Sequence, residues 1–219
     1  MRLLMRPGRA LAAMLLPVLA GCGSSTSTAA DESIEPPLKY SVKVGNETAT
    51  LFEGVPVRID GTFTNPTVAI IPDSSRVFPY QGVKFRYPKT FTFEADVDDP
   101  ASKTWVLSGN DIKITYSVYQ GTLSTKDFAD SMLDQFGREN SEIVDKQATI
   151  TLGQEKLSGI SLRTTLAGHK MQIDIYSVPS RGSETRILMF QDSLDDSGNR
   201  SEEGSRVLAE IGSSFSIER

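Results

Sequence analysis

Apolar and polar residues alternate over much of the chain, which is the pattern of strands with one buried face. Alternation over residues 40–51, interrupted by the turn pair Gly45-Asn46, predicts a β-hairpin. A further alternating strand is predicted over 56–63, and a short apolar strand between two prolines over 68–71. The first part of the folded domain is therefore predicted to be rich in strands.

The alternation is clearest over residues 83–88, where Val83, Phe85 and Tyr87 share one face of a predicted strand. Pro88 ends this strand because it lacks the amide that a sheet ladder needs. The same reasoning predicts later strands over 91–93, 105–107, 112–118, 147–152, 158–166, 169–178 and 186–190. The last of these is continuously apolar, as expected of a strand that is covered on both faces.

A helix is predicted to begin at Ser124, a good N-cap residue with Asp127 three positions later. Phe128, Met132 and Phe136 recur four residues apart and form an apolar stripe, which is expected to lie on a sheet. Gly137 is placed to end the helix.

A second helix is predicted to begin at Ser201, where two glutamates in the first turn complement the helix dipole. Val207, Leu208 and Ile211 form its inward stripe, and Gly212 is placed at its end. The apolar residues that follow, Phe215 and Ile217, are expected to close the core.

The run Val83-Lys84-Phe85-Arg86-Tyr87-Pro88 and the ending Ser213-Ser214-Phe215-Ser216-Ile217 together resemble the PsbP/Mog1-like superfamily. The resemblance covers residues 76–219 and implies an α+β fold in which a mainly antiparallel sheet is sandwiched between helices. The family usually has an aromatic residue close after the Tyr-Pro pair and a Trp within the next few residues. The chain departs from this pattern, since Phe91 stands in here and Trp105 comes later. Residues 39–75 fall outside the match and are interpreted as a β-rich N-terminal extension of the domain.

The first 21 residues have the order of an export signal: three arginines, an apolar run and a pair of small residues. The apolar run is shorter than the roughly 20 residues that a membrane-spanning helix needs. Leu19-Ala20-Gly21-Cys22 then closely resembles the lipobox of bacterial lipoproteins. The resemblance implies that the Gly21–Cys22 bond is cleaved and that Cys22 carries the lipid.

Residues 22–38 are predicted to be the lipidated cysteine and a flexible linker, because they are small, polar and then proline-rich. The predicted location is the surface of a bacterial cell membrane, with the folded domain in solution beside it. In many Gram-negative bacteria an aspartate directly after the cysteine favours the inner membrane. Gly23 and Ser24 stand there instead, which favours the outer membrane and its periplasmic face.

Composition narrows the possible functions. The formal net charge is −5, and loss of three arginines with the leader lowers it to −8, which disfavours nucleic acid as a partner. With the single cysteine assigned to lipid, no disulfide or cysteine-based metal site is expected within the chain. The single histidine excludes the usual zinc sites, so no metal and no cofactor are predicted.

No catalytic motif is evident. The one histidine, His169, lies in a predicted hairpin turn and is interpreted as an exposed turn residue. Residues 159–163 lack the second glycine of a nucleophile elbow and lie in a strand pattern. We therefore expect no enzymatic activity.

Two acidic clusters, Asp96-Asp98-Asp99 and Asp192-Asp195-Asp196, are interpreted as solvated loops. When Gly198 is aligned with the glycine of an EF-hand loop, Ser193 and Gly204 fall where acidic ligands are required. The sequons at Asn46 and Asn199 are interpreted as accidental.

Three hypotheses for function remain open. The first is a non-enzymatic binding or assembly module at an envelope membrane, which docks on an unknown envelope protein. The second is a lipoprotein that binds a small molecule or metal for a transporter or sensor. The third, an enzyme, would need a cleft that joins His169 to a serine and a carboxylate. PsbP and Mog1 proteins act mainly by docking on larger partners, so the resemblance favours the first hypothesis.

Overall fold

The computed structural model describes residues 31–180 and 182–218 of the 219-residue chain. The predicted leader, the lipobox residues Gly21 and Cys22, and the first part of the predicted linker lie outside the described residues. Within the described ranges, no helix is both long enough and apolar enough to cross a membrane.

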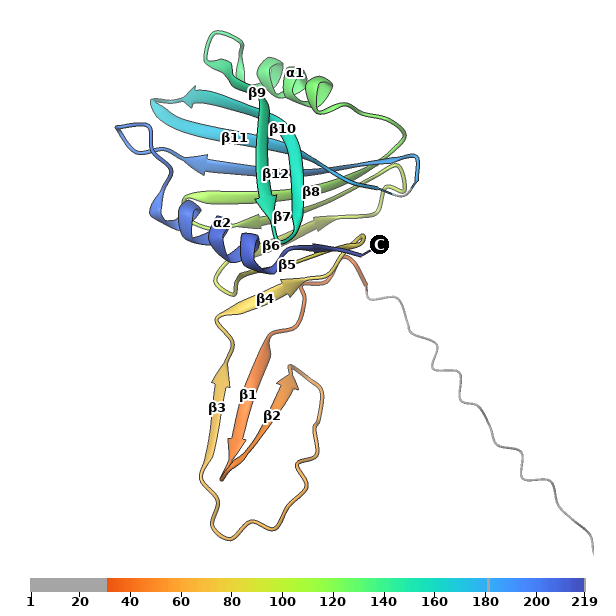
Figure 1. Cartoon of the computed structure of the whole chain (residues 1–219), viewed down its shortest axis with the longest axis vertical. Helices are drawn as coiled ribbons and strands as arrows, with labels where there is room; N and C mark the ends of the chain where they lie inside the picture. The colour runs from red at the N-terminus through yellow and green to blue at the C-terminus, as the bar shows by residue number, and fades with distance from the viewer. Residues whose placement is uncertain (1–30, 181, 219) are drawn as a thin grey trace, which may run out of the picture. The chain divides into compact units, whose positions relative to one another are not determined.

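The centre of the domain is a seven-stranded sheet in the order β6-β7-β8-β12-β11-β10-β9 (Figure 1). Every neighbouring pair in it is antiparallel. Its strands are β6 (Thr92–Asp96), β7 (Ser102–Ser108), β8 (Ile112–Gln120), β9 (Ser141–Leu152), β10 (Glu155–Leu166), β11 (His169–Val178) and β12 (Glu184–Ser193). All the strands predicted after residue 90 are present, although β9 begins at Ser141 rather than at Gln147.

One face of this sheet packs against helix α1 (Thr125–Phe136). Ala129 and Leu133 of the helix are buried with six sheet residues, namely Ile160, Leu162, Ile173, Ile175, Ile187 and Met189. The hydroxyl of Ser124 accepts a hydrogen bond from the amide of Asp127 at 3.0 Å, and Gly137 follows the helix with φ 86°. Both predicted caps of α1 are confirmed.

The other face carries a larger core, which is covered by helix α2 (Glu202–Ser214) and a small sheet in the order β13-β5-β4. The small sheet is formed by β4 (Ser75–Phe78), β5 (Val83–Pro88) and β13 (Ser216–Ile217). Phe215 is buried, as predicted. The helix does not end at Gly212 but continues to Ser214, where the amide of Phe215 bonds to the carbonyl of Ile211.

Strand β12 lies between the two cores. Ile187 and Met189 are buried in the core beneath α1, whereas Leu188 and Phe190 are buried in the core beneath α2 and the small sheet. The prediction of a strand covered on both faces is confirmed.

The predicted fold class is wrong. Strands make up 51% of the structure and two helices only 13%, which is a β-rich fold of mostly antiparallel sheets rather than an α+β sandwich between helices. The physical reason is that strands provide much of the cover on the second face: Phe78 on β4 and Val83, Phe85 and Tyr87 on β5 are all buried there. The match in pattern over residues 83–88 identified a strand but not the layer to which it belongs.

Residues 39–72 form a third sheet, with order β2-β1-β3, from β1 (Lys39–Val44), β2 (Glu47–Phe52) and β3 (Val68–Pro72). The predicted hairpin and the short strand after it are confirmed. The strand predicted over 56–63 is wrong, because this stretch contains no strand residues and nearly all of it is exposed. Alternating apolar residues form a strand only where a neighbouring strand accepts their backbone groups.

Residues 31–38, the last part of the predicted linker, contact the domain. The indole of Trp105 donates a hydrogen bond to the carbonyl oxygen of Glu32 at 2.8 Å, and Lys103 pairs with the carboxylate of Glu32 at 2.7 Å. Arg76 donates to the carbonyl of Pro36 at 2.7 Å. Trp105 is fully buried, with the ring of Tyr116 centred 5.8 Å from its own. The chain is thus attached to the core just before β1 begins.

Candidate functional site

The β2-β1-β3 sheet has one apolar face. In the strand register, Val42 lies between Ala49 on β2 and Ile70 on β3. Because side chains alternate along a strand, the rows on either side of Val42 add more apolar residues to the same face. We call this set the apolar face: Tyr40, Val42, Val44, Ala49, Leu51, Val68 and Ile70. One charged residue, Glu47, pairs with Val44 at the β2 margin of this face.

Strand β3 leaves the apolar face partly open. Val68 is 55% exposed and Ile70 is 62% exposed, and no residue of β3 is charged. Strand β3 is also an edge strand, so among the described residues its outer backbone groups have no strand partner. An apolar edge of this kind is a template for another strand, and soluble proteins usually protect it with charges.

The opposite face of the same sheet is mixed. Lys39, Lys43, Thr48 and Thr50 lie on it, and the ammonium of Lys39 lies 5.5 Å from the centre of the Phe52 ring. Ile71 of β3 also lies on this face and is 60% exposed. The two faces therefore differ in their lysines and threonines, whereas β3 exposes apolar side chains on both.

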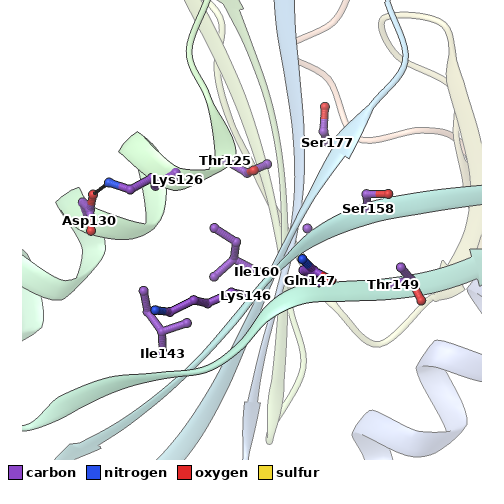
Figure 2. Close-up of a pocket in the computed structure, with 11 residues that line it drawn as sticks. Thr125, Lys126, Asp130, Ile143, Lys146, Gln147, Thr149, Ser158, Ile160 and Ser177 are labelled. Atoms are coloured by element: carbon purple, nitrogen blue, oxygen red, sulfur yellow. Dashed lines mark hydrogen bonds and ion pairs between the residues drawn. The ribbon is translucent and has the colours of Figure 1, made fainter.

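A groove lies beneath the first half of α1, over strands β9 and β10 (Figure 2). Its volume is about 860 Å³, which is within the usual size of ligand sites. Ile160 is buried in its floor and Ile143 is partly buried beside it. The helix packs through Ala129 and Leu133, so its first turn leaves this part of the sheet uncovered.

Three hydroxyl groups form a row across the sheet at one end of the groove. Ser158 on β10 pairs in register with Thr149 on β9 and with Ser177 on β11, and all three residues are exposed. Figure 2 shows this row on one side of Ile160, and Ile143 with Lys146 on the other. The groove thus has an apolar floor and polar walls.

Two lysines line the groove, and they differ in their partners. Lys126 is bound to Asp130 at 2.6 Å within the helix. Lys146, an exposed residue of β9, has no ion-pair partner among the described residues. The uncompensated charge of the groove is therefore positive and lies at Lys146.

A cluster of charged residues is buried on the other face of the main sheet. Asp174 on β11 and Asp192 on β12 are 1% and 0% exposed, and Arg200 bridges their carboxylates. Ser161 donates to Asp174 at 2.5 Å, and Ser201 donates to Asp192 at 2.7 Å while capping α2. The cluster fastens the start of α2 to the sheet.

Burial raises the pKa of the Asp192 carboxyl above its usual range, although Ser201 and Arg200 act in the opposite direction. For Arg200, burial acts in the other direction and lowers the pKa of the guanidinium. The carboxylates of Asp174 and Asp192 raise this pKa by more, so its net shift is upward. Asp192 was interpreted from the sequence as part of a solvated loop, and this interpretation is wrong. It follows four buried residues of β12 and is the last inward position of that strand.

The other candidate residues from the sequence are not brought together. His169 is exposed at the start of β11, and Ser161 is buried inside β10 against Asp174. Asp99 accepts the amide of Ala101, and Asp195 accepts the amide of Asn199, so both are turn residues. Among the described residues, no group of three or more His, Cys, Asp or Glu side chains could hold a metal ion.

Sequence reasoning missed both the apolar face and the groove. The alternation over 40–51 indicated a hairpin, and the uncharged run 68–71 was visible, but their order in the sheet was not. The groove depends on how far α1 extends over β9 and β10, and no local pattern encodes this.

No protein-family model matches the chain, and no curated protein matches it. Among solved structures, a protein from Bacteroides thetaiotaomicron is similar over 67% of this chain, with 12% identity and a TM-score of 0.39. The chain spans about half, 48%, of the length of that protein.

Two other solved structures are similar. LpqN, which is involved in cell envelope biogenesis of Mycobacterium tuberculosis, is 16% identical with a TM-score of 0.41; the match covers 63% of this chain and 83% of LpqN. PA94 from Pseudomonas aeruginosa, a protein of unknown function, is 11% identical with a TM-score of 0.27; the match covers 55% of this chain and 83% of PA94.

Proposed function

We propose that the protein is a lipid-anchored lipoprotein of a bacterial envelope, and that it acts without catalysis by docking another envelope protein on the apolar face. The observation that carries this proposal is the exposure of Val68 and Ile70 on an uncharged edge strand. Val42, at the centre of the apolar face, is only 5% exposed, so the part of this face that lacks cover is the edge formed by β3. A partner surface would cover that edge.

The expected partner presents an uncharged apolar strand or surface. A strand added beside β3 would bond to its open backbone edge, and its side chains would extend the rows of Val68 and Ile70. Residues 39–72 contain three basic and three acidic side chains and so have no formal net charge, which suits an uncharged apolar partner surface. We propose a different envelope protein as that partner; binding only to a bilayer or to a second copy would contradict the proposal.

The anchor and the absence of catalysis rest on separate observations. The lipobox resemblance assigns the lipid to Cys22, and Gly23 after it favours the outer membrane. The exposed position of His169, away from the buried Ser161, supports a non-enzymatic role.

Ile70→Lys should weaken binding of the partner at least about tenfold. Burial of this side chain contributes about 1–2 kcal/mol, and a lysine there would have to be desolvated on binding, whereas 1.4 kcal/mol already corresponds to a factor of ten. The partner is identified by chemical crosslinking in membranes, then purified and titrated against the wild-type protein and the variant. Ile70 is 62% exposed, so the variant should fold normally.

The matched control is Thr48→Lys, an exposed position on the opposite face of the same sheet, which should leave the Kd within about twofold. Equal effects of the two substitutions would refute a role for the apolar face. Recovery of only a second copy of the chain would refute docking on a different protein.

A further inference from the structure

We propose that the groove beneath α1 binds a single-chain amphiphile with an anionic head group. This site is on the main sheet, so the inference is independent of docking on the apolar face. We infer the class of ligand from three features of the groove: its apolar floor, the charge of Lys146, and the row of hydroxyl groups that ends the floor.

The floor suits a short alkyl chain. Ile143 is partly exposed beside the buried side chain of Ile160, in a groove of about 860 Å³, so most of the apolar surface that Ile143 and Ile160 offer a ligand comes from Ile143. Removing such surface from water stabilises a bound chain by roughly 25 cal/mol per Å². The row formed by Thr149, Ser158 and Ser177 ends the apolar floor, so we expect a chain of medium length rather than a long one.

The charge of the groove selects an anionic head. Lys126 is neutralised by Asp130 at 2.6 Å, whereas Lys146 has no ion-pair partner among the described residues. Figure 2 shows Lys146 next to Ile143, at the end of the floor opposite the hydroxyl row. A carboxylate at that end would pair with Lys146 while the alkyl chain lies on Ile143 and Ile160.

The test uses decanoate as the probe, titrated calorimetrically into the purified protein below the concentration at which decanoate forms micelles. Decyltrimethylammonium, which has the same chain and the opposite charge, is titrated in parallel. We expect decanoate to bind with a Kd below 1 mM (about −4 kcal/mol) and at least tenfold more tightly than the cationic probe. Equal affinity for the two probes, or no binding of decanoate, would overturn the proposal.

Two variants locate the site. Lys146→Glu should weaken decanoate binding at least tenfold, and Ser158→Phe, which fills the groove from an exposed position, should abolish binding of decanoate. Lys84→Glu on β5, an exposed lysine outside the groove, is the charge control and should change the Kd less than twofold. Circular dichroism confirms that each variant is folded. Decanoate binding that survives both groove substitutions would place the ligand elsewhere and overturn the assignment.

Discussion

Arg200→Met should lower the free energy of unfolding by roughly 3 kcal/mol at pH 7, the lower end of the range for breaking a buried ion pair. The substitution leaves Asp174 and Asp192, which are 1% and 0% exposed, without their shared cation. We expect the lower end because 27% of the Arg200 side chain is exposed. Urea unfolding of the purified protein measures the change.

The free energy of unfolding that Arg200→Met loses should become smaller as the pH falls. Burial already raises the pKa of Asp192 above the ordinary value of 3.8. At a pH between the unfolded and the folded pKa, the folded protein therefore keeps a proton on Asp192 that the unfolded chain has released. Stability therefore falls as the pH rises from 3.8 through the folded-state pKa of Asp192. Removal of Arg200 raises that pKa further, so the variant should differ from the wild type most at pH 7 and least near pH 4.

Two further variants test the physical reason. Adding Asp174→Asn and Asp192→Asn to Arg200→Met should recover much of the lost stability, because no buried charge is then left unpaired. Arg206→Met, at an exposed position on α2, should change the free energy of unfolding by less than about 0.5 kcal/mol. An unchanged urea midpoint for Arg200→Met at pH 7 would show that the cluster does not hold α2 in place.

Cys22→Ser should release the protein from the membrane fraction of its host. Each buried CH₂ of an acyl chain contributes about 0.8 kcal/mol to membrane binding, and a serine has no thiol to receive the lipid. The measurement is the share of the protein that sediments with membranes after a high-salt wash. We expect most of the variant to remain in the supernatant.

Ser24→Ala, two residues beyond the cysteine, serves as the control and should sediment like the wild type. Cys22 precedes the described residues, so the released variant should keep the folded domain, which circular dichroism checks. A Cys22→Ser protein that sediments with membranes as completely as the wild type would disprove the lipid anchor.

Local signals predicted most of the individual elements. The alternation over 112–118 indicated β8, and Ser124 with Asp127 indicated the start of α1, because period and capping are properties of neighbouring residues. The continuous apolar run over 186–190 even indicated a strand covered on both faces. These predictions succeeded because each depends only on residues that are close together in the sequence.

The predictions that were wrong or missing concern which elements cover each face of a sheet. The buried positions of β5 pack against the second face of the main sheet, a role that the sequence pattern attributed to helices. Asp192 looked like a loop residue because a carboxylate is rarely buried, and its cation, Arg200, is eight positions away in the sequence. The apolar face and the groove likewise depend on long-range register, which sequence pattern alone does not specify.

Docking on the apolar face can be tested by photo-crosslinking in native membranes from position 70, compared with position 48. The two positions lie on opposite faces of the same sheet and both are exposed. The proposed docking predicts one reproducible adduct with a different envelope protein from position 70 and little or none from position 48. Adducts from position 70 with lipid alone or with a second copy of the chain, or equal yields of the same adduct from both positions, would contradict it.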